Sequence, residues 1–132
     1  MSAPVELLQQ VPLFQGLDRG HLETLARSFK ERTFSAGSTV TTEGQGGVGF
    51  FVIEDGGATV SVGGEERRKL GAGDWFGELA LIDDSPRSAT IVADSDLRCW
   101  GLTSWEFRPL VEQNASIAWS MLQTLAKRLR EG

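Results

Sequence analysis

Residues 49–62 read Gly-Phe-Phe-Val-Ile-Glu-Asp-Gly-Gly-Ala-Thr-Val-Ser-Val. The stretch joins two β-rich pieces, 49–54 and 58–62, through an acidic turn that contains two glycines. In the second piece apolar and polar residues alternate, which is the period of two of a strand with one buried face. The centre of this chain is therefore predicted to be β-structure.

Further β-rich pieces lie on both sides of this stretch, at residues 38–42, 88–93 and 97–102. Glycine-rich or acidic turns separate them, and the 16 glycines of the 132-residue chain are about twice the usual share. Several short strands at close spacing are typical of a sandwich or a jelly-roll barrel. No βαβ alternation or dinucleotide-binding fingerprint is present. We therefore predict a barrel over about residues 33–102.

Helical patterns flank this region. A short helix is expected after Pro4, and Asp18 is placed to cap a second one. Its apolar residues follow the helical spacing of 0, 3, 4 and 7: Leu22, Leu25, Ala26 and Phe29.

Two more helices are expected after the barrel. Ser104 can cap the first, which Pro109 should bend or interrupt. Residues 114–131 form the second, and its apolar residues are predicted to line one side: Ala118, Leu122, Leu125 and Leu129, with Ile117 and Met121 beside them. The predicted fold class is thus mainly β with flanking helices. We expect one domain, 1–132, with helices over about 4–30, a jelly-roll barrel over about 33–102, and carboxyl-terminal helices over about 104–131.

Composition excludes several classes of function. The formal net charge is −5, so a basic surface that wraps duplex DNA is not expected. With one cysteine, Cys99, and one histidine, His21, the chain has neither an internal disulfide nor a zinc cluster. No apolar run approaches the roughly 20 residues that a membrane span requires. We expect a cytoplasmic protein with no metal and no membrane partner.

Residues 73–90 read Gly-Asp-Trp-Phe-Gly-Glu-Leu-Ala-Leu-Ile-Asp-Asp-Ser-Pro-Arg-Ser-Ala-Thr and carry the most chemistry. Gly77 permits an unusual backbone conformation, and residues 78–82 can form one helical turn whose first amides favour an anion. Arg87 is a bidentate partner for phosphate oxygens, and Ser88 adds a hydroxyl donor. The segment therefore offers an anion-binding site.

The carboxylate of Glu78 lies within the same segment. When ionised it only accepts hydrogen bonds, so it repels phosphate and suits a sugar hydroxyl. Together with the anion site this indicates a ribose phosphate. An ion pair between Glu78 and Arg87 that merely holds a turn to a strand is the structural alternative. The apolar residues 79–82 are more often part of a core than of a ligand site.

Residues 76–93, FGELALIDDSPRSATIVA, resemble the phosphate-binding cassette of the cyclic nucleotide-binding domain family. That family includes the catabolite activator protein, the regulatory subunits of cAMP-dependent protein kinase and cyclic nucleotide-gated channels. Residues 11–40 are similar to its opening helices and first strand, 41–62 to its hairpin region, and 70–78 to its entry into the cassette. The resemblance covers nearly the whole chain.

The resemblance implies a non-enzymatic sensor domain whose ligand is cAMP or possibly cGMP, with no other cofactor. Glu78 would accept a hydrogen bond from the ribose 2′-hydroxyl, and Arg87 would pair with the cyclic phosphate, assisted by Ser88. Backbone amides near the cassette would donate to the ligand, and a barrel strand would supply an apolar contact. The implied ligand-binding residues are Gly77, Glu78, Leu79, Ala80, Arg87, Ser88, Ala89 and Val60.

The family's base-capping residues lie at about the position where this chain ends, at Gly132. We therefore expect weak discrimination between cAMP and cGMP, of about tenfold, although Ser88 could also contact the guanine amino group.

Two other functions remain open. One is an interaction or dimerisation module of the same fold that binds no nucleotide, in which the last helix, with Trp119, Met121 and Leu125, packs on a second copy or a partner protein. The other is a cupin-like metalloenzyme, which lacks its ligands because His21 lies outside the barrel.

Overall fold

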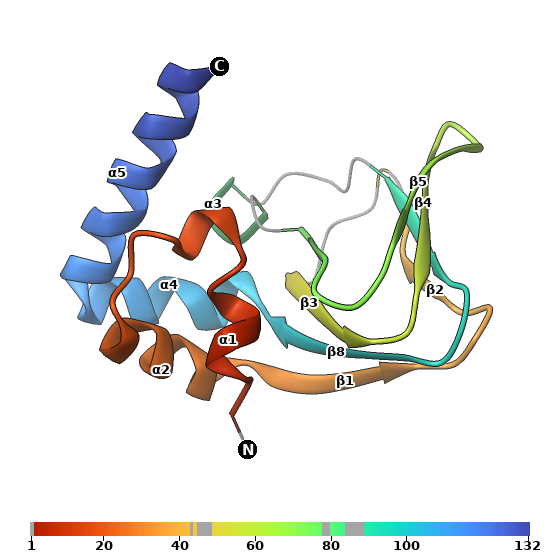
Figure 1. The fold of residues 1–132 in the computed structure, drawn as a ribbon, viewed down its shortest axis with the longest axis horizontal. Helices are drawn as coiled ribbons and strands as arrows, with labels where there is room; N and C mark the ends of the chain where they lie inside the picture. The colour runs from red at the N-terminus through yellow and green to blue at the C-terminus, as the bar shows by residue number, and fades with distance from the viewer. Residues whose placement is uncertain (1, 43, 45–48, 78–79, 84–88) are drawn as a thin grey trace.

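The computed structural model describes residues 2–42, 44, 49–77, 80–83 and 89–132, with the backbone alone at 80 and 83. It contains two four-stranded sheets in which every pairing is antiparallel, with helices packed against one of them (Figure 1). The first sheet has the order β1 (Lys30–Phe34), β8 (Leu97–Leu102), β3 (Phe50–Asp55) and β6 (Trp75–Phe76). The second has the order β2 (Thr39–Thr41), β7 (Thr90–Ala93), β4 (Ala58–Val62) and β5 (Glu65–Leu70).

The helices lie at both ends of the sequence, as predicted. The amino-terminal ones are α1 (Val5–Leu8), the 3₁₀ helix η1 (Pro12–Phe14) and α2 (Arg19–Ser28). A short helix, α3 (Ala80–Asp83), interrupts the strands, and α4 (Ser104–Gln113) and α5 (Ala115–Glu131) follow them. Figure 1 shows α1, α2 and α4 gathered beside the first sheet, with α5 standing away from it. The predicted class, mainly β with flanking helices in a jelly-roll fold, is confirmed.

Strand β3 is buried on both faces, which explains its unbroken apolar sequence. Phe50 and Val52 pack into a core shared with the helices, whereas Phe51 and Ile53 pack into a second core between the two sheets. Its neighbour β8 also contributes to both cores. The first sheet is therefore the central layer of the molecule, with helices on one side and the second sheet on the other.

Three phenylalanines fix the helices to this central sheet. The ring of Phe14, from η1, meets Phe29 at 6.4 Å and Phe50 at 5.8 Å between centroids, and Phe29 meets Phe50 at 5.9 Å. All three pairs are edge-to-face, the favoured geometry for aromatic rings. Asp18 caps α2 as predicted, accepting a hydrogen bond from the amide of His21 at 2.8 Å.

The turn at 55–57 does not close a hairpin. Strands β3 and β4 belong to different sheets, and residues 55–57 connect them. Gly56 has a φ of +97°, and a side chain there would overlap the carbonyl oxygen of Asp96. The hairpin in this region joins β4 to β5 through Gly63 and Gly64, both with positive φ.

The carboxyl-terminal helices differ in detail from the prediction. The N-cap of α4 is Thr103 rather than Ser104, because Thr103 and Glu106 form a capping box. The helix continues through Pro109 to its end.

In α5 the buried apolar residues are Ile117 and Met121. Leu122 and Leu129 were predicted to share the packed side, but their exposed fractions are 57% and 82%. The helix thus has a second apolar stripe, which faces outward. Only the first half of α5 packs on the rest of the chain.

The crossing between the sheets should be sensitive to a side chain at Gly56. In Gly56→Ala the new side chain overlaps the Asp96 carbonyl, and a positive φ adds strain. Gly37→Ala is the control, because it has the strain of a positive φ but nothing lies within 4 Å of its Cβ position. Strain alone costs about 1–3 kcal/mol, and the overlap adds about 1–3 kcal/mol more. Urea unfolding should therefore show a larger loss for Gly56→Ala. Equal losses would mean that the close approach imposes no constraint.

Candidate functional site

The chain passes from one sheet to the other between residues 77 and 89. It leaves the first sheet after Phe76, forms α3, and enters the second sheet at Thr90 (Figure 1). Gly77 follows β6 with a φ of +83°, a left-handed conformation that glycine adopts without strain. We refer to residues 77–89, which connect the two sheets, as the cassette.

The eight predicted ligand-binding residues divide into two groups. Glu78, Leu79, Arg87 and Ser88 lie outside the described residues, so their predicted roles stay predictions. The structure describes Gly77 and Ala89 at the two ends of the cassette, the backbone of Ala80 at the start of α3, and Val60 on β4.

Val60 belongs to the inner face of the second sheet. Its exposed fraction is 7%, and its partners across the sheet are Ile91 on β7 and Arg68 on β5. On the same sheet the buried Thr41 donates its hydroxyl to the carbonyl oxygen of Ala89 at 3.2 Å. Val60 therefore lies one strand away from the chain that leaves the cassette, and its predicted contact with a ligand stays a prediction.

Helix α3 ties the cassette to the helical core. Leu81 is buried there in the same cluster as Phe107 of α4, in agreement with its prediction as a core residue. Ile82, predicted in the same way, has an exposed fraction of 52%. The cassette is thus attached to both cores of the molecule: through Leu81 to the helices, and through Ala89 to the second sheet.

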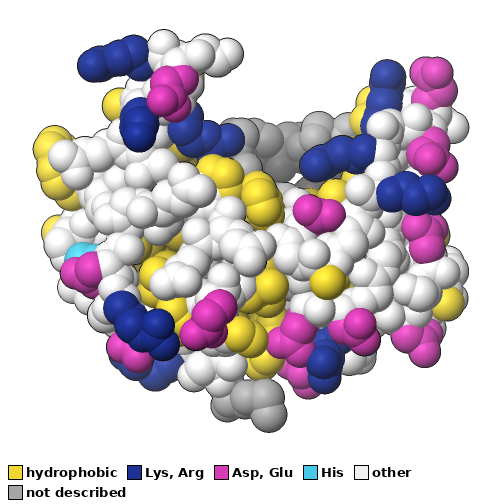
Figure 2. Space-filling view, viewed as in Figure 1, with side chains coloured by type: hydrophobic (Ala, Val, Ile, Leu, Met, Phe, Trp, Pro, Cys, Tyr) yellow, Lys and Arg dark blue, Asp and Glu magenta, His cyan; other side chains and the backbone are white. Residues whose placement is uncertain are grey.

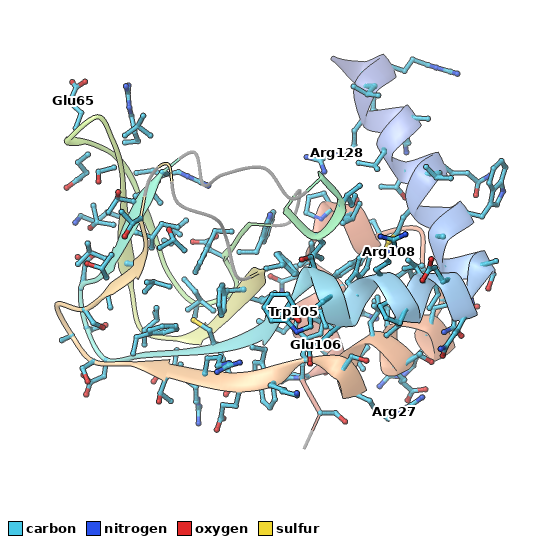
Figure 3. All side chains as sticks on the ribbon, turned by 180° about the vertical axis from the view of Figure 1, so that it is seen from behind. Arg27, Glu65, Trp105, Glu106, Arg108 and Arg128 are labelled. Carbon is cyan, nitrogen blue, oxygen red and sulfur yellow. The ribbon has the colours of Figure 1, made fainter. Side chains whose placement is uncertain are left out.

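The surface is hollowed between α5 and the β4–β5 hairpin, and Lys and Arg side chains stand on both rims of the hollow (Figure 2). On α5 the cations are Lys127, Arg128 and Arg130, and on β5 they are Arg67, Arg68 and Lys69. Figure 3 shows Arg128 projecting from α5 in the direction of α3.

Sequence reasoning missed the contribution of β5. Five successive charged residues, 65–69, conceal the period of two of this strand. The buried Leu70 at its end was the available signal, because counting back two residues from it places Arg68 on the inner face.

Among the described residues, Cys99 and Glu106 have shifted pKa values. Burial raises the pKa of the Cys99 thiol to about 12, so this side chain is a neutral core residue rather than a nucleophile. Burial alone would also raise the pKa of Glu106, but hydrogen bonds from Thr103 and Lys30 outweigh it and hold that pKa below its ordinary value. The distance from Lys30 Nζ to Glu106 Oε2 is 3.0 Å.

A pocket of about 430 Å³ lies elsewhere, at the Phe34 end of β1. Its described lining consists of Thr33, Phe34, Ser35, Asp55, Asp96, Leu97 and Arg98, and it includes none of the predicted ligand-binding residues that the structure describes. The described residues hold no group of three or more histidine, cysteine or carboxylate side chains that could bind a metal ion. In the same part of the chain no helix has the length and hydropathy of a membrane span.

Comparison with known proteins agrees with this geometry. Residues 31–114 match the family model described as the cyclic nucleotide-binding domain, a range that includes the whole cassette. The chain therefore belongs to the cyclic nucleotide-binding domain family, as the resemblance predicted.

The curated relatives of the chain include a potassium channel and a protein kinase regulatory subunit. A cyclic nucleotide-gated potassium channel of Rhizobium etli is 34% identical over 123 residues, which are 93% of this chain and 34% of the channel. A regulatory subunit of cAMP-dependent protein kinase from Colletotrichum orbiculare is 36% identical over 108 residues, or 80% of this chain and 28% of that protein. The chain thus spans about a third or less of the length of these relatives.

Solved structures show the same fold. The amino-terminal domain of a transcriptional regulator from Streptomyces coelicolor superposes with a TM-score of 0.86 at 30% identity, covering 95% of this chain and 93% of that one. The regulatory domain of a Toxoplasma gondii protein kinase, crystallised with cAMP, gives a TM-score of 0.74 at 28% identity, covering 97% of this chain and 49% of that one.

Proposed function

We propose that this chain is a non-enzymatic sensor domain that binds cAMP or cGMP at the cassette. The observation that carries the proposal is the family match over residues 31–114, which includes every residue of the cassette. The described geometry supports it: a left-handed Gly77 opens the cassette, and the buried Val60 lies one strand from the point where β7 begins.

In this proposal the cassette binds the phosphate and the ribose. Arg87 pairs with the cyclic phosphate and Ser88 donates its hydroxyl, because charge-assisted bonds from a guanidinium suit phosphate oxygens. Backbone amides around Leu79, Ala80 and Ala89 are further donors. Glu78 accepts the hydrogen bond of the ribose 2′-hydroxyl, since an ionised carboxylate is acceptor-only.

In the same proposal Val60 makes an apolar contact with the nucleotide. The domain itself catalyses no reaction. A cytoplasmic location belongs to the proposal as well, as does the absence of DNA binding by this chain alone, for which the net charge of −5 argues.

A second candidate function, self-association, is favoured by the outward stripe of α5. Trp119, Leu122, Ala126 and Leu129 follow one another at spacings of three and four residues, the pattern of a coiled-coil seam. Trp119 has an exposed fraction of 64%, and Ala126 is exposed too. We propose that this stripe pairs two copies of the chain. Such pairing is compatible with nucleotide binding, and it is also a function for a domain that binds no nucleotide.

Arg87→Ala should remove most of the affinity for cyclic nucleotides. Losing one partner of a charge-assisted pair costs about 2–5 kcal/mol, which is roughly 30- to 5,000-fold in Kd. Calorimetric titration with cAMP and cGMP measures this. Arg27→Ala, which removes the same charge from α2, is the matched control and should leave Kd unchanged. An unchanged Kd in Arg87→Ala would exclude this residue from the site.

The role of Glu78 predicts a preference for cAMP over 2′-deoxy-cAMP, because a carboxylate that loses its donor is costly to bury. Glu78→Gln should reduce that preference, since a neutral amide oxygen accepts a weaker bond. Competition binding with the two nucleotides measures the ratio in both proteins. Equal affinities in the wild type would contradict the contact with the 2′-hydroxyl.

Self-association predicts a concentration-dependent mass in analytical ultracentrifugation. Leu122→Glu should shift the chain to monomer, because it places a carboxylate in the apolar seam, whereas the neighbouring Gln123→Glu should not. A wild type that stays monomeric at every concentration would refute pairing through α5.

A further inference from the structure

The pocket at the Phe34 end of β1 is separate from the cassette. Figure 1 shows β1 running away from the helices, so this end of the strand lies on the far side of the molecule from α5. Strand β3 connects the two regions: Phe51 pairs with Phe76, just before the cassette, and Asp55 lines the pocket. The four residue steps between Phe51 and Asp55 span about 13 Å. The pocket is therefore a different site from the one proposed for the nucleotide.

Hydrogen bonds between three turns hold the wall of this pocket. The amide of Ala36, in the turn after β1, donates to Oδ1 of Asp96 at 3.0 Å. The amide of Gly57, in the turn after β3, donates to the hydroxyl of Ser95 at 3.0 Å. Both acceptors belong to the turn before β8, so this turn is joined to the other two. A pocket formed in advance in this way loses little conformational freedom when a ligand binds.

The pocket carries an excess of negative charge. The guanidinium of Arg98 lies 2.7 Å from Oε2 of Glu54, which neutralises the cation of the lining. Within the described ranges no Lys, Arg or His side chain lies at ion-pair distance from Asp55 or Asp96. These two carboxylates are therefore left to attract a cation from outside the chain.

The size and the apolar part of the lining favour an organic cation over a metal ion. The volume of about 430 Å³ is within the range of small-molecule pockets and far larger than a bare metal ion needs. Leu97 is buried, and the ring of the half-buried Phe34 is held edge-to-face against Phe51 at 6.0 Å between centroids. A ligand with a positive head and an apolar stem matches both parts of this lining.

We propose that this pocket binds an ammonium or guanidinium group on a short alkyl chain, with the charged group at Asp55 and Asp96 and the chain against Phe34. Both groups are pure hydrogen-bond donors, and ionised carboxylates are pure acceptors. The source of this chemistry is either a free amine or a lysine or arginine side chain of another protein. The inference goes beyond the proposed function and does not depend on it.

An NMR titration of the ¹⁵N-labelled chain with butylguanidine tests the proposal. We expect saturable amide shifts at residues 33–35 and 96–98, with a Kd of about 1–10 mM for so small a ligand. Asp55→Asn keeps the shape of the side chain but removes its charge, so it should weaken binding about fivefold. Glu23→Gln, which removes the same charge from α2, is the matched control and should keep the Kd. Thermal unfolding of both variants verifies that the fold is intact.

Two further probes examine the charge and the source of the ligand. Butylurea has the shape of butylguanidine without its charge and should not shift these amides. The peptide acetyl-Gly-Arg-Gly-amide presents the same guanidinium on a polypeptide. If it binds through Asp55 at least as tightly as butylguanidine, the side chain of a partner protein is the source; if it binds more weakly, a free amine is the source.

Three results would overturn the proposal: no saturable shift with butylguanidine or the peptide, equal shifts with butylurea, or an unchanged Kd in Asp55→Asn. Each of them leaves the proposed function standing, because none concerns a cassette residue. Conversely, a chain that binds no cyclic nucleotide but binds butylguanidine at this pocket loses the proposed function and keeps this inference.

Discussion

Strands β3 and β8 are buried on both faces, and this burial holds the layers of the molecule together. Because their side chains alternate between two cores, the helices and the second sheet each need the first sheet as a packing surface. The rings of Phe14, Phe29 and Phe50 join the amino-terminal helices to one face. The other face buries Cys99, and this burial raises the pKa of its thiol to about 12. Both layers are thereby held in fixed positions relative to the strand that leads into the cassette.

The cassette is the segment that links these two cores. At its first end Gly77 turns the chain away from β6, and Leu81 then packs among the helices. At its last end the Ala89 carbonyl accepts a hydrogen bond from Thr41, and β7 pairs with β4. A ligand bound by this segment therefore contacts a part of the chain that is attached to the helical core and to the inner face of the second sheet at once.

Local periodicity predicted most of the elements. The alternation at 58–62 and the spacing from Leu22 to Phe29 are both reproduced, since each depends on one buried face. Local sequence patterns do not encode which strands pair with each other or which face of a helix is buried. Residues 55–57, Asp-Gly-Gly, are of the type that closes β-hairpins, yet the strands on either side of them belong to different sheets. The five successive charged residues of β5 conceal its alternation. Which of the two apolar stripes of α5 is buried depends on where η1 packs. The cassette motif was recognised from its residue types, whereas Arg68 needed the observed register.

The most direct test of the central claim is calorimetric titration of the wild-type chain with cAMP, cGMP and 5′-AMP in parallel. The proposed site, in which Arg87 pairs with the cyclic phosphate and Glu78 accepts from the ribose, predicts saturable binding of one cyclic nucleotide per chain. It also predicts much weaker heats with 5′-AMP. Flat titrations with both cyclic nucleotides, or equal affinity for 5′-AMP and cAMP, would contradict the account.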